Sequence, residues 1–191
     1  MILILNCGSA KTRYIQELVD EFSDFCTIPI LDFTLADLVG KSGVIITGAT
    51  ILVTEQEIGH FLKQVEFIKT TTIPILGICF GHQLIGITFG AFASRIREDR
   101  DWQTIGLLDP SPLFDKLPDE FEMMEDHCEA ISIPANFNLI AASDACVNEG
   151  MQHKELPIFG VQFHPEVSGN YGRTIFENFI GICTQKGAIN H

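Results

Sequence analysis

The feature that most constrains the fold is an abrupt change of pattern within residues 74–86, PILGICFGHQLIG. The first half is an apolar run, which is typical of a strand buried on both faces of a parallel sheet. A helical pattern follows without a linker, and Cys79 stands at the junction between Gly77 and Gly81. This spacing is that of a nucleophile elbow with sulfur in place of oxygen, because small flanking residues permit a tight turn that projects the side chain from the sheet edge.

The role of Cys79 has two interpretations on this segment alone. A free cysteine is often a small buried core residue without reactivity. At a helix N-terminus, however, unpaired N–H groups and the helix dipole stabilise a thiolate, which is the nucleophilic form. The two elbow glycines favour the nucleophile.

Strands and helices alternate through the first half of the chain. Strands are expected at residues 2–6, 25–30, 43–47 and 73–78, helices at 12–22 and directly after Cys79, and a short helical connector at 35–38. Thr54 and Glu57 have the spacing of a capping box, which predicts a helix starting there with an apolar face that extends to Ile68. This alternation predicts an α/β fold with a parallel sheet covered on both faces.

Short strands with little helix between them characterise the chain after about residue 91. They are expected at 104–108, 121–125, 137–142, 147–152 and 158–162, before a last helix at about 171–183. This half is predicted to extend the sheet with antiparallel and mixed strands. At 191 residues the chain can bury a sizeable core, and residues 1–191 are expected to form a single domain.

Charge and cysteine usage limit the possible partners and location. The net charge of −13 argues against binding to nucleic acid or to an anionic membrane. No apolar stretch approaches the length of a membrane span, and no signal peptide precedes the first strand. The six cysteines are scattered without a CxxC pair, so a reduced, cytoplasmic protein is expected. Cys79 and His82 have the spacing of a metal pair, but no second pair matches, so neither metal nor other cofactor is expected.

A cysteine nucleophile needs a base, and the base needs an orienting group. Among the six histidines, only His164 has a carboxylate in an obvious supporting position, in the sequence GVQFHPEV at residues 160–167. Residues two apart in extended chain point to the same side, so Glu166 can fix the imidazole tautomer. A histidine at a strand end that merely bonds to its neighbour is the alternative. With the elbow in the same chain, the triad Cys79–His164–Glu166 is the better hypothesis.

Acyl chemistry at a cysteine also needs donors for the developing oxyanion. One expected donor is the backbone N–H of Phe80, directly after the nucleophile. The second should come from a loop near the same sheet edge, and Thr47-Gly48-Ala49-Thr50 is the best placed because it follows the third strand.

Residues 74–85 and 160–167 resemble the two signature motifs of the class I (triad-type) glutamine amidotransferases, and the resemblance covers nearly the whole chain. It implies a flavodoxin-like three-layer fold and hydrolysis of glutamine to glutamate and ammonia through a thioester on Cys79. It also implies that His164 protonates the departing ammonia, that Glu166 holds His164, that Gln83 helps bind the substrate and that Gly48 supplies an oxyanion amide.

Within this family the second half is similar to the amidotransferase portion of GMP synthetases, in the segments PLF at 112–114, HCEAI at 127–131 and HPEV at 164–167. That branch implies a separate ATP-dependent synthetase (ATP-pyrophosphatase) subunit that receives the ammonia and activates XMP. It also implies that His127 and Glu129 lie near the active site and face this partner. A loop histidine bonded locally is the alternative for His127.

Three other functions stay open on the sequence. The first is a stand-alone hydrolase or amidotransferase acting on another γ-glutamyl compound, and the second is the glutaminase subunit of another synthase, such as anthranilate synthase. The third is a catalytically idle regulatory or binding subunit. The chain also departs from the family pattern Ser-Gly-Gly-Pro at residues 47–50, where Ala49 would be strained by about 1 kcal/mol if its φ were positive.

Overall fold

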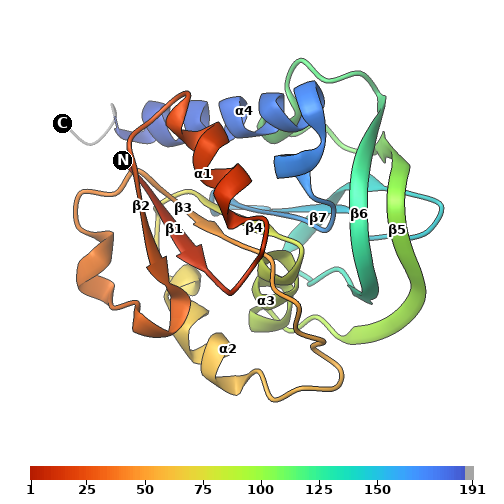
Figure 1. Ribbon diagram of the computed structural model, residues 1–191, viewed down its shortest axis with the longest axis horizontal. Helices are drawn as coiled ribbons and strands as arrows, with labels where there is room; N and C mark the ends of the chain where they lie inside the picture. The colour runs from red at the N-terminus through yellow and green to blue at the C-terminus, as the bar shows by residue number, and fades with distance from the viewer. Residues whose placement is uncertain (188–191) are drawn as a thin grey trace.

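Five parallel strands form the centre of the computed structural model, which describes residues 1–187 of the chain (Figure 1). In spatial order they are β2 (Phe25–Pro29), β1 (Ile2–Asn6), β3 (Gly43–Ile46), β4 (Ile75–Ile78) and β9 (Ile158–Val161). Because the strands are parallel, their carboxyl ends lie along one edge of the sheet. The loops after β3, β4 and β9 therefore meet at that edge.

Helices cover both faces of this parallel sheet, as the alternation of elements predicts (Figure 1). One face carries α1 (Thr12–Asp20) and α4 (Gly169–Gly187), and the other carries α2 (Gly59–Val65) and α3 (Phe80–Thr88). The side chains of β1 alternate accordingly, because Ile2 and Ile4 pack with the first pair of helices and Leu3 and Leu5 with the second. No helix among residues 1–187 is both long and apolar enough to cross a membrane.

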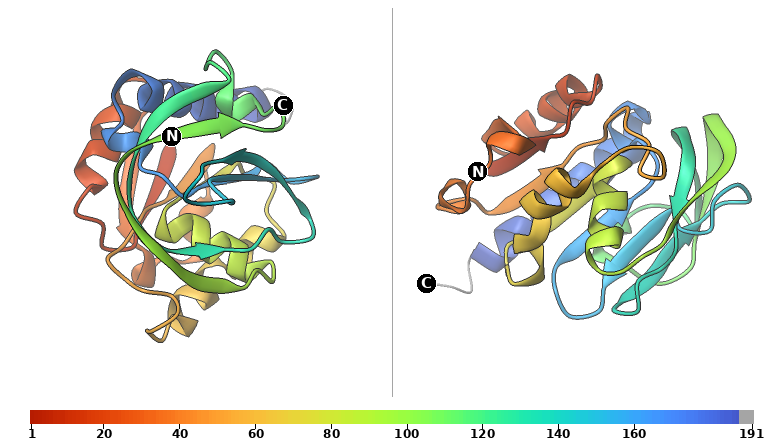
Figure 2. Two further views of the ribbon diagram at one scale, coloured as in Figure 1. Left: turned by 90° about the vertical axis from the view of Figure 1, so that its right-hand side faces the viewer. Right: turned by 90° about the horizontal axis from the view of Figure 1, so that it is seen from below.

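Four antiparallel strands extend the sheet beyond β9. They are β8 (Gly150–His153), β7 (Phe137–Ala142), β5 (Ala93–Leu107) and β6 (Glu120–Ile131), in that spatial order. The long β5–β6 ribbon curls strongly (Figure 2). As a result β6 returns to the end of β9, where the backbone N–H of His164 donates to the carbonyl of Met124 at 2.9 Å.

The predicted capping box at Thr54 is wrong. The α2 helix begins at Gly59, and neither Thr54 nor Glu57 caps it. Instead, the backbone N–H of Thr54 donates to the Glu129 carboxylate at 3.0 Å, as does its hydroxyl, so a distant acidic group takes the oxygen and amide that a cap would use.

Three further boundaries differ from the sequence prediction. β5 begins near residue 93 rather than 104, and β6 continues to residue 131 rather than ending at 125. The first half of β5 carries mostly charged side chains, which conceal a strand that is stabilised mainly by backbone pairing with β6. The last helix continues to Gly187, and residues 188–191 lie outside the described part of the chain.

Candidate active site

Cys79 lies at the sharp turn between β4 and α3. Its backbone has φ 51° and ψ −107°, a conformation that non-glycine residues rarely adopt. Within the described residues only two other non-glycine residues, Asp101 and Lys116, have positive φ. The backbone N–H of Cys79 donates to the carbonyl of Val161 at 2.8 Å, which ties the turn to the end of β9. Strain of this kind at a buried thiol is typical of a functional position.

The glycines on either side of Cys79 are required by close packing. A Cβ on Gly81 would lie 2.2 Å from the carbonyl oxygen of Ile46, and a Cβ on Gly77 would lie 2.6 Å from the backbone of Gly81. Any side chain at these positions would push α3 away from the sheet. The structure therefore has the tight turn that the Gly-x-Cys-x-Gly spacing predicts.

His164 and Glu166 lie together at the end of β9. The Nδ1 atom of His164 is 2.7 Å from the Glu166 carboxylate, and both residues are buried. The backbone turns into a short 3₁₀ helix at Pro165–Val167, but the pair still forms. The Ser168 hydroxyl donates to the His164 carbonyl at 2.6 Å and further fixes this turn. The contact between His164 and Glu166 matches the one expected from their spacing.

The environment of His164 favours its protonated form. Burial by itself lowers the pKa of His164, but the charge of Cys79, its hydrogen bond to the imidazole and the Glu166 carboxylate outweigh it and raise the pKa to about 10. At neutral pH the imidazole therefore carries a proton beside the Cys79 sulfur. Such a group can donate a proton to a departing amine.

The loop after β3 passes directly over the Cys79–His164 pair. A Cβ built on Gly48 would lie 3.5 Å from Cys79 Cβ and 3.5 Å from His164 Cε1. Phe80 is the first residue of α3, so its N–H has no partner within the helix. Ala49 does not have a positive φ, and the strain considered for it does not arise.

Gln162 is a pocket residue that the sequence reasoning missed. It is fully buried directly after β9, and its side-chain Nε2 lies 3.6 Å from the Cys79 sulfur. Gln83 donates to the Gln162 side chain at 3.1 Å and to the Glu129 carbonyl at 3.3 Å. The signal was available, because Gln162 is two residues before His164 and extended chain places both on the same side.

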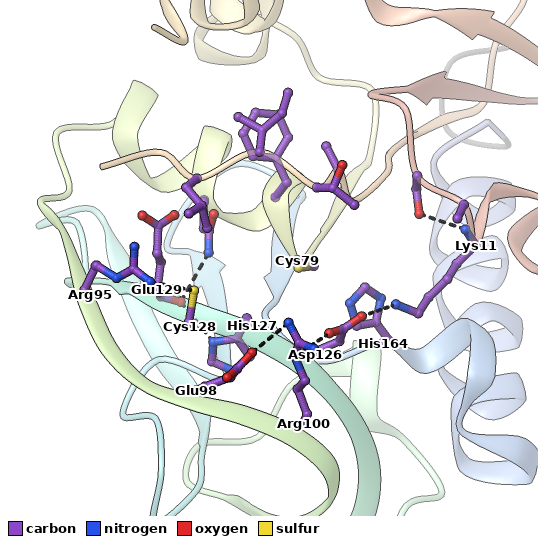
Figure 3. Close-up of a pocket in the computed structure, with 18 residues that line it drawn as sticks. Lys11, Cys79, Arg95, Glu98, Arg100, Asp126, His127, Cys128, Glu129 and His164 are labelled. Atoms are coloured by element: carbon purple, nitrogen blue, oxygen red, sulfur yellow. Dashed lines mark hydrogen bonds and ion pairs between the residues drawn. The ribbon is translucent and has the colours of Figure 1, made fainter. Parts of the chain in front are cut away.

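A cavity of about 470 Å³ opens over these groups, lined among others by Cys79, Gln83 and His164 (Figure 3). Charged side chains form its wall. Asp126 pairs with Lys11 at 2.8 Å and with Arg100 at 3.5 Å. The cavity is large enough for an amino acid and offers charges of both signs.

His127 and Glu129 lie on β6, not on a loop, and both line this cavity. The Glu129 carboxylate accepts hydrogen bonds from the backbone N–H groups of Val53 at 2.7 Å and Thr54 at 3.0 Å. This fixes the loop that follows Gly48. Both side chains are buried in the single chain, and their orientation toward a synthetase stays a prediction.

The comparisons with known proteins agree with this architecture. Residues 3–182 match the family model described as glutamine amidotransferase class-I. The glutamine-hydrolysing subunit of GMP synthase from Thermoplasma acidophilum is 37% identical over 185 residues, covering 95% of this chain and 92% of that protein.

Solved structures give the same result. A crystal structure of a GMP synthase subunit from Thermoplasma acidophilum superposes with a TM-score of 0.90 at 33% identity, covering 98% of this chain and 96% of that one. A glutamine amidotransferase from Thermotoga maritima shares the fold, with a TM-score of 0.74 at 19% identity over 98% of this chain and 85% of that one. The likeness confirms the expected flavodoxin-like fold, and the chain belongs to the class I glutamine amidotransferases.

Proposed function

We propose that this protein hydrolyses L-glutamine to glutamate and ammonia and passes the ammonia to a separate ATP-dependent synthetase subunit, which converts XMP to GMP. The observation that carries this proposal is the meeting of Cys79 with the His164–Glu166 pair in one cavity. The similarity to glutamine-hydrolysing subunits of GMP synthases supports the choice of ammonia acceptor.

In the first step the Cys79 sulfur attacks the side-chain carboxamide carbon of glutamine. The tetrahedral intermediate places negative charge on its oxygen, and the backbone N–H groups of Phe80 and Gly48 are the proposed donors to it. The C–N bond then breaks, and His164 gives its proton to the departing ammonia. A glutamyl thioester on Cys79 remains.

In the second step water attacks the thioester. Neutral His164 takes a proton from the water, the C–S bond breaks and glutamate leaves. Glu166 keeps the imidazole oriented through its 2.7 Å contact with Nδ1, so that Nε2 faces the reacting atoms in both steps. Gln83 and the charged wall of the cavity are proposed to bind the amino-acid substrate.

The test uses glutamine labelled with ¹⁵N in its amide and the XMP-aminating subunit from the same organism. We expect the label in GMP when both proteins, ATP and XMP are present, together with a rise in glutaminase activity on mixing. Label in anthranilate with the corresponding synthase, or hydrolysis that the aminating partner does not change, would instead favour the alternative functions.

A further inference from the structure

A second cluster of ionisable side chains lies behind the cavity, and the proposed reaction does not use it. His127 belongs to β6, whereas Cys146 and Glu149 belong to the connection between β7 and β8. One ligand atom from each of the three lies within 4.8 Å of the others, and all three residues are buried. Nitrogen, sulfur and oxygen donors in one site are the set that Zn²⁺ accepts in proteins.

The hydrogen bonds of His127 leave one ring nitrogen free. Its Nδ1 lies 2.9 Å from the carbonyl oxygen of Glu129, which can only accept, so Nδ1 carries the proton. Nε2 then holds a lone pair. It has no hydrogen-bond partner, although a Glu125 carboxylate oxygen lies 3.2 Å away. Histidines that bind metals typically donate their other N–H to a backbone carbonyl in this way.

The carboxylates of the cluster also lack partners. Both side-chain oxygens of Glu125 and one oxygen of Glu149 are buried without a hydrogen bond, while the other Glu149 oxygen accepts from the Ser143 hydroxyl at 2.7 Å. No lysine or arginine within residues 1–187 pairs with either carboxylate. Buried acceptors that converge without a cation are unfavourable, and a bound divalent ion removes this cost.

We propose that a zinc ion occupies this cluster, bound by His127 Nε2, the Cys146 sulfur and the Glu149 carboxylate, with Glu125 as the fourth ligand. Four protein ligands make a closed site of the structural kind. His127 also lines the cavity, which gives the ion a route of entry.

The position of this zinc site relates it to His164 without direct contact with substrate. The Glu149 carbonyl accepts from the backbone N–H of Gln162 at 2.9 Å, and the Met124 carbonyl accepts from that of His164 at 2.9 Å. An ion that joins β6 to the residues before β8 therefore braces both neighbours of the segment that carries His164. Its expected role is structural, and its removal should lower thermal stability.

The test uses the full chain, stripped with a chelator and titrated with Co²⁺ as a spectroscopic probe for Zn²⁺. We expect one Co²⁺ per chain, a near-ultraviolet sulfur-to-cobalt charge-transfer band and its loss when Zn²⁺ is added. Cys146→Ser should abolish the band, and Glu149→Gln should weaken binding by more than about tenfold. Cys128→Ser is the matched control, because this other thiol at the cavity should leave the band unchanged.

Failure of the stripped wild-type chain to take up Co²⁺ or Zn²⁺ would overturn the zinc site, and so would a band that survives Cys146→Ser or disappears in Cys128→Ser. Circular dichroism of each variant checks that it is folded. The wild-type titration and its melting temperature with and without Zn²⁺ decide the question even if Cys146→Ser does not fold.

Discussion

Gly48→Ala separates the proposed oxyanion role of the loop after β3 from its role in folding. The added methyl group would lie 3.5 Å from both Cys79 Cβ and His164 Cε1, which is ordinary van der Waals contact. The expected loss in the free energy of unfolding is therefore below about 1 kcal/mol. The same methyl group fills the space above the thiol where the substrate oxygen must sit. Loss of one oxyanion donor typically lowers kcat by about 10²–10³-fold, or roughly 2.7–4 kcal/mol in activation free energy.

The assay measures glutamate release with the synthetase partner present, alongside urea unfolding. Gly181→Ala is the matched control, because a Cβ there meets nothing within 4 Å. In this helix it should leave kcat unchanged and raise stability by about 0.5–1 kcal/mol. Wild-type kcat/KM in Gly48→Ala would refute the proposed oxyanion role, and a loss of stability above about 3 kcal/mol would refute the packing argument.

Three further variants test neighbouring claims. Glu166→Gln keeps the size of the side chain but loses the negative charge beside His164 Nδ1, so kcat should fall by about 10²–10⁴-fold with little change in KM; an unchanged kcat would contradict the role of Glu166. Glu129→Gln disrupts the contacts that hold the loop at Val53 and Thr54 and should raise KM for glutamine, whereas Glu55→Gln, which removes only an exposed ion pair, should not. Burial lowers the pKa of His82 to about 3, so its neutral form is favoured in the folded chain. Its contribution to stability is complete above about pH 6.5 and is lost as pH falls toward 3. His82→Gln should therefore flatten the fall in unfolding free energy between about pH 6.5 and 4, and identical slopes would contradict this.

The parallel half of the fold could be predicted because its signals are local. Apolar strands, amphipathic helices and the two elbow glycines each act within a few residues of Cys79. The same holds for His164 and Glu166, whose contact follows from a spacing of two residues in nearly extended chain. The packing of Gly81 against Ile46 explains why the motif is so short.

The errors come from contacts between residues far apart in sequence. Thr54 has the right neighbours for a cap, but the Glu129 carboxylate, 75 residues later, binds it instead. The start of β5 resembles a polar loop because its side chains are charged and its stability comes from pairing with β6.

The zinc cluster could not be found by the spacing of cysteines and histidines. Its three donors, at positions 127, 146 and 149, meet only because β6 curls back toward the β7–β8 connection. Short spacings, such as that of Cys79 and His82, carry no information about this meeting. Only the three-dimensional arrangement brings a histidine, a thiol and a carboxylate together.

Covalent trapping of Cys79 tests the central claim most directly. The full chain, with its synthetase partner, ATP and XMP present, is treated with a diazoketone or chloroketone analogue of glutamine and analysed by intact mass and peptide mapping. We predict one adduct per chain on Cys79, protected by glutamine and absent from Cys79→Ala, which should remain folded. No adduct under these conditions, or an adduct on another cysteine, would contradict the assignment of Cys79 as the nucleophile.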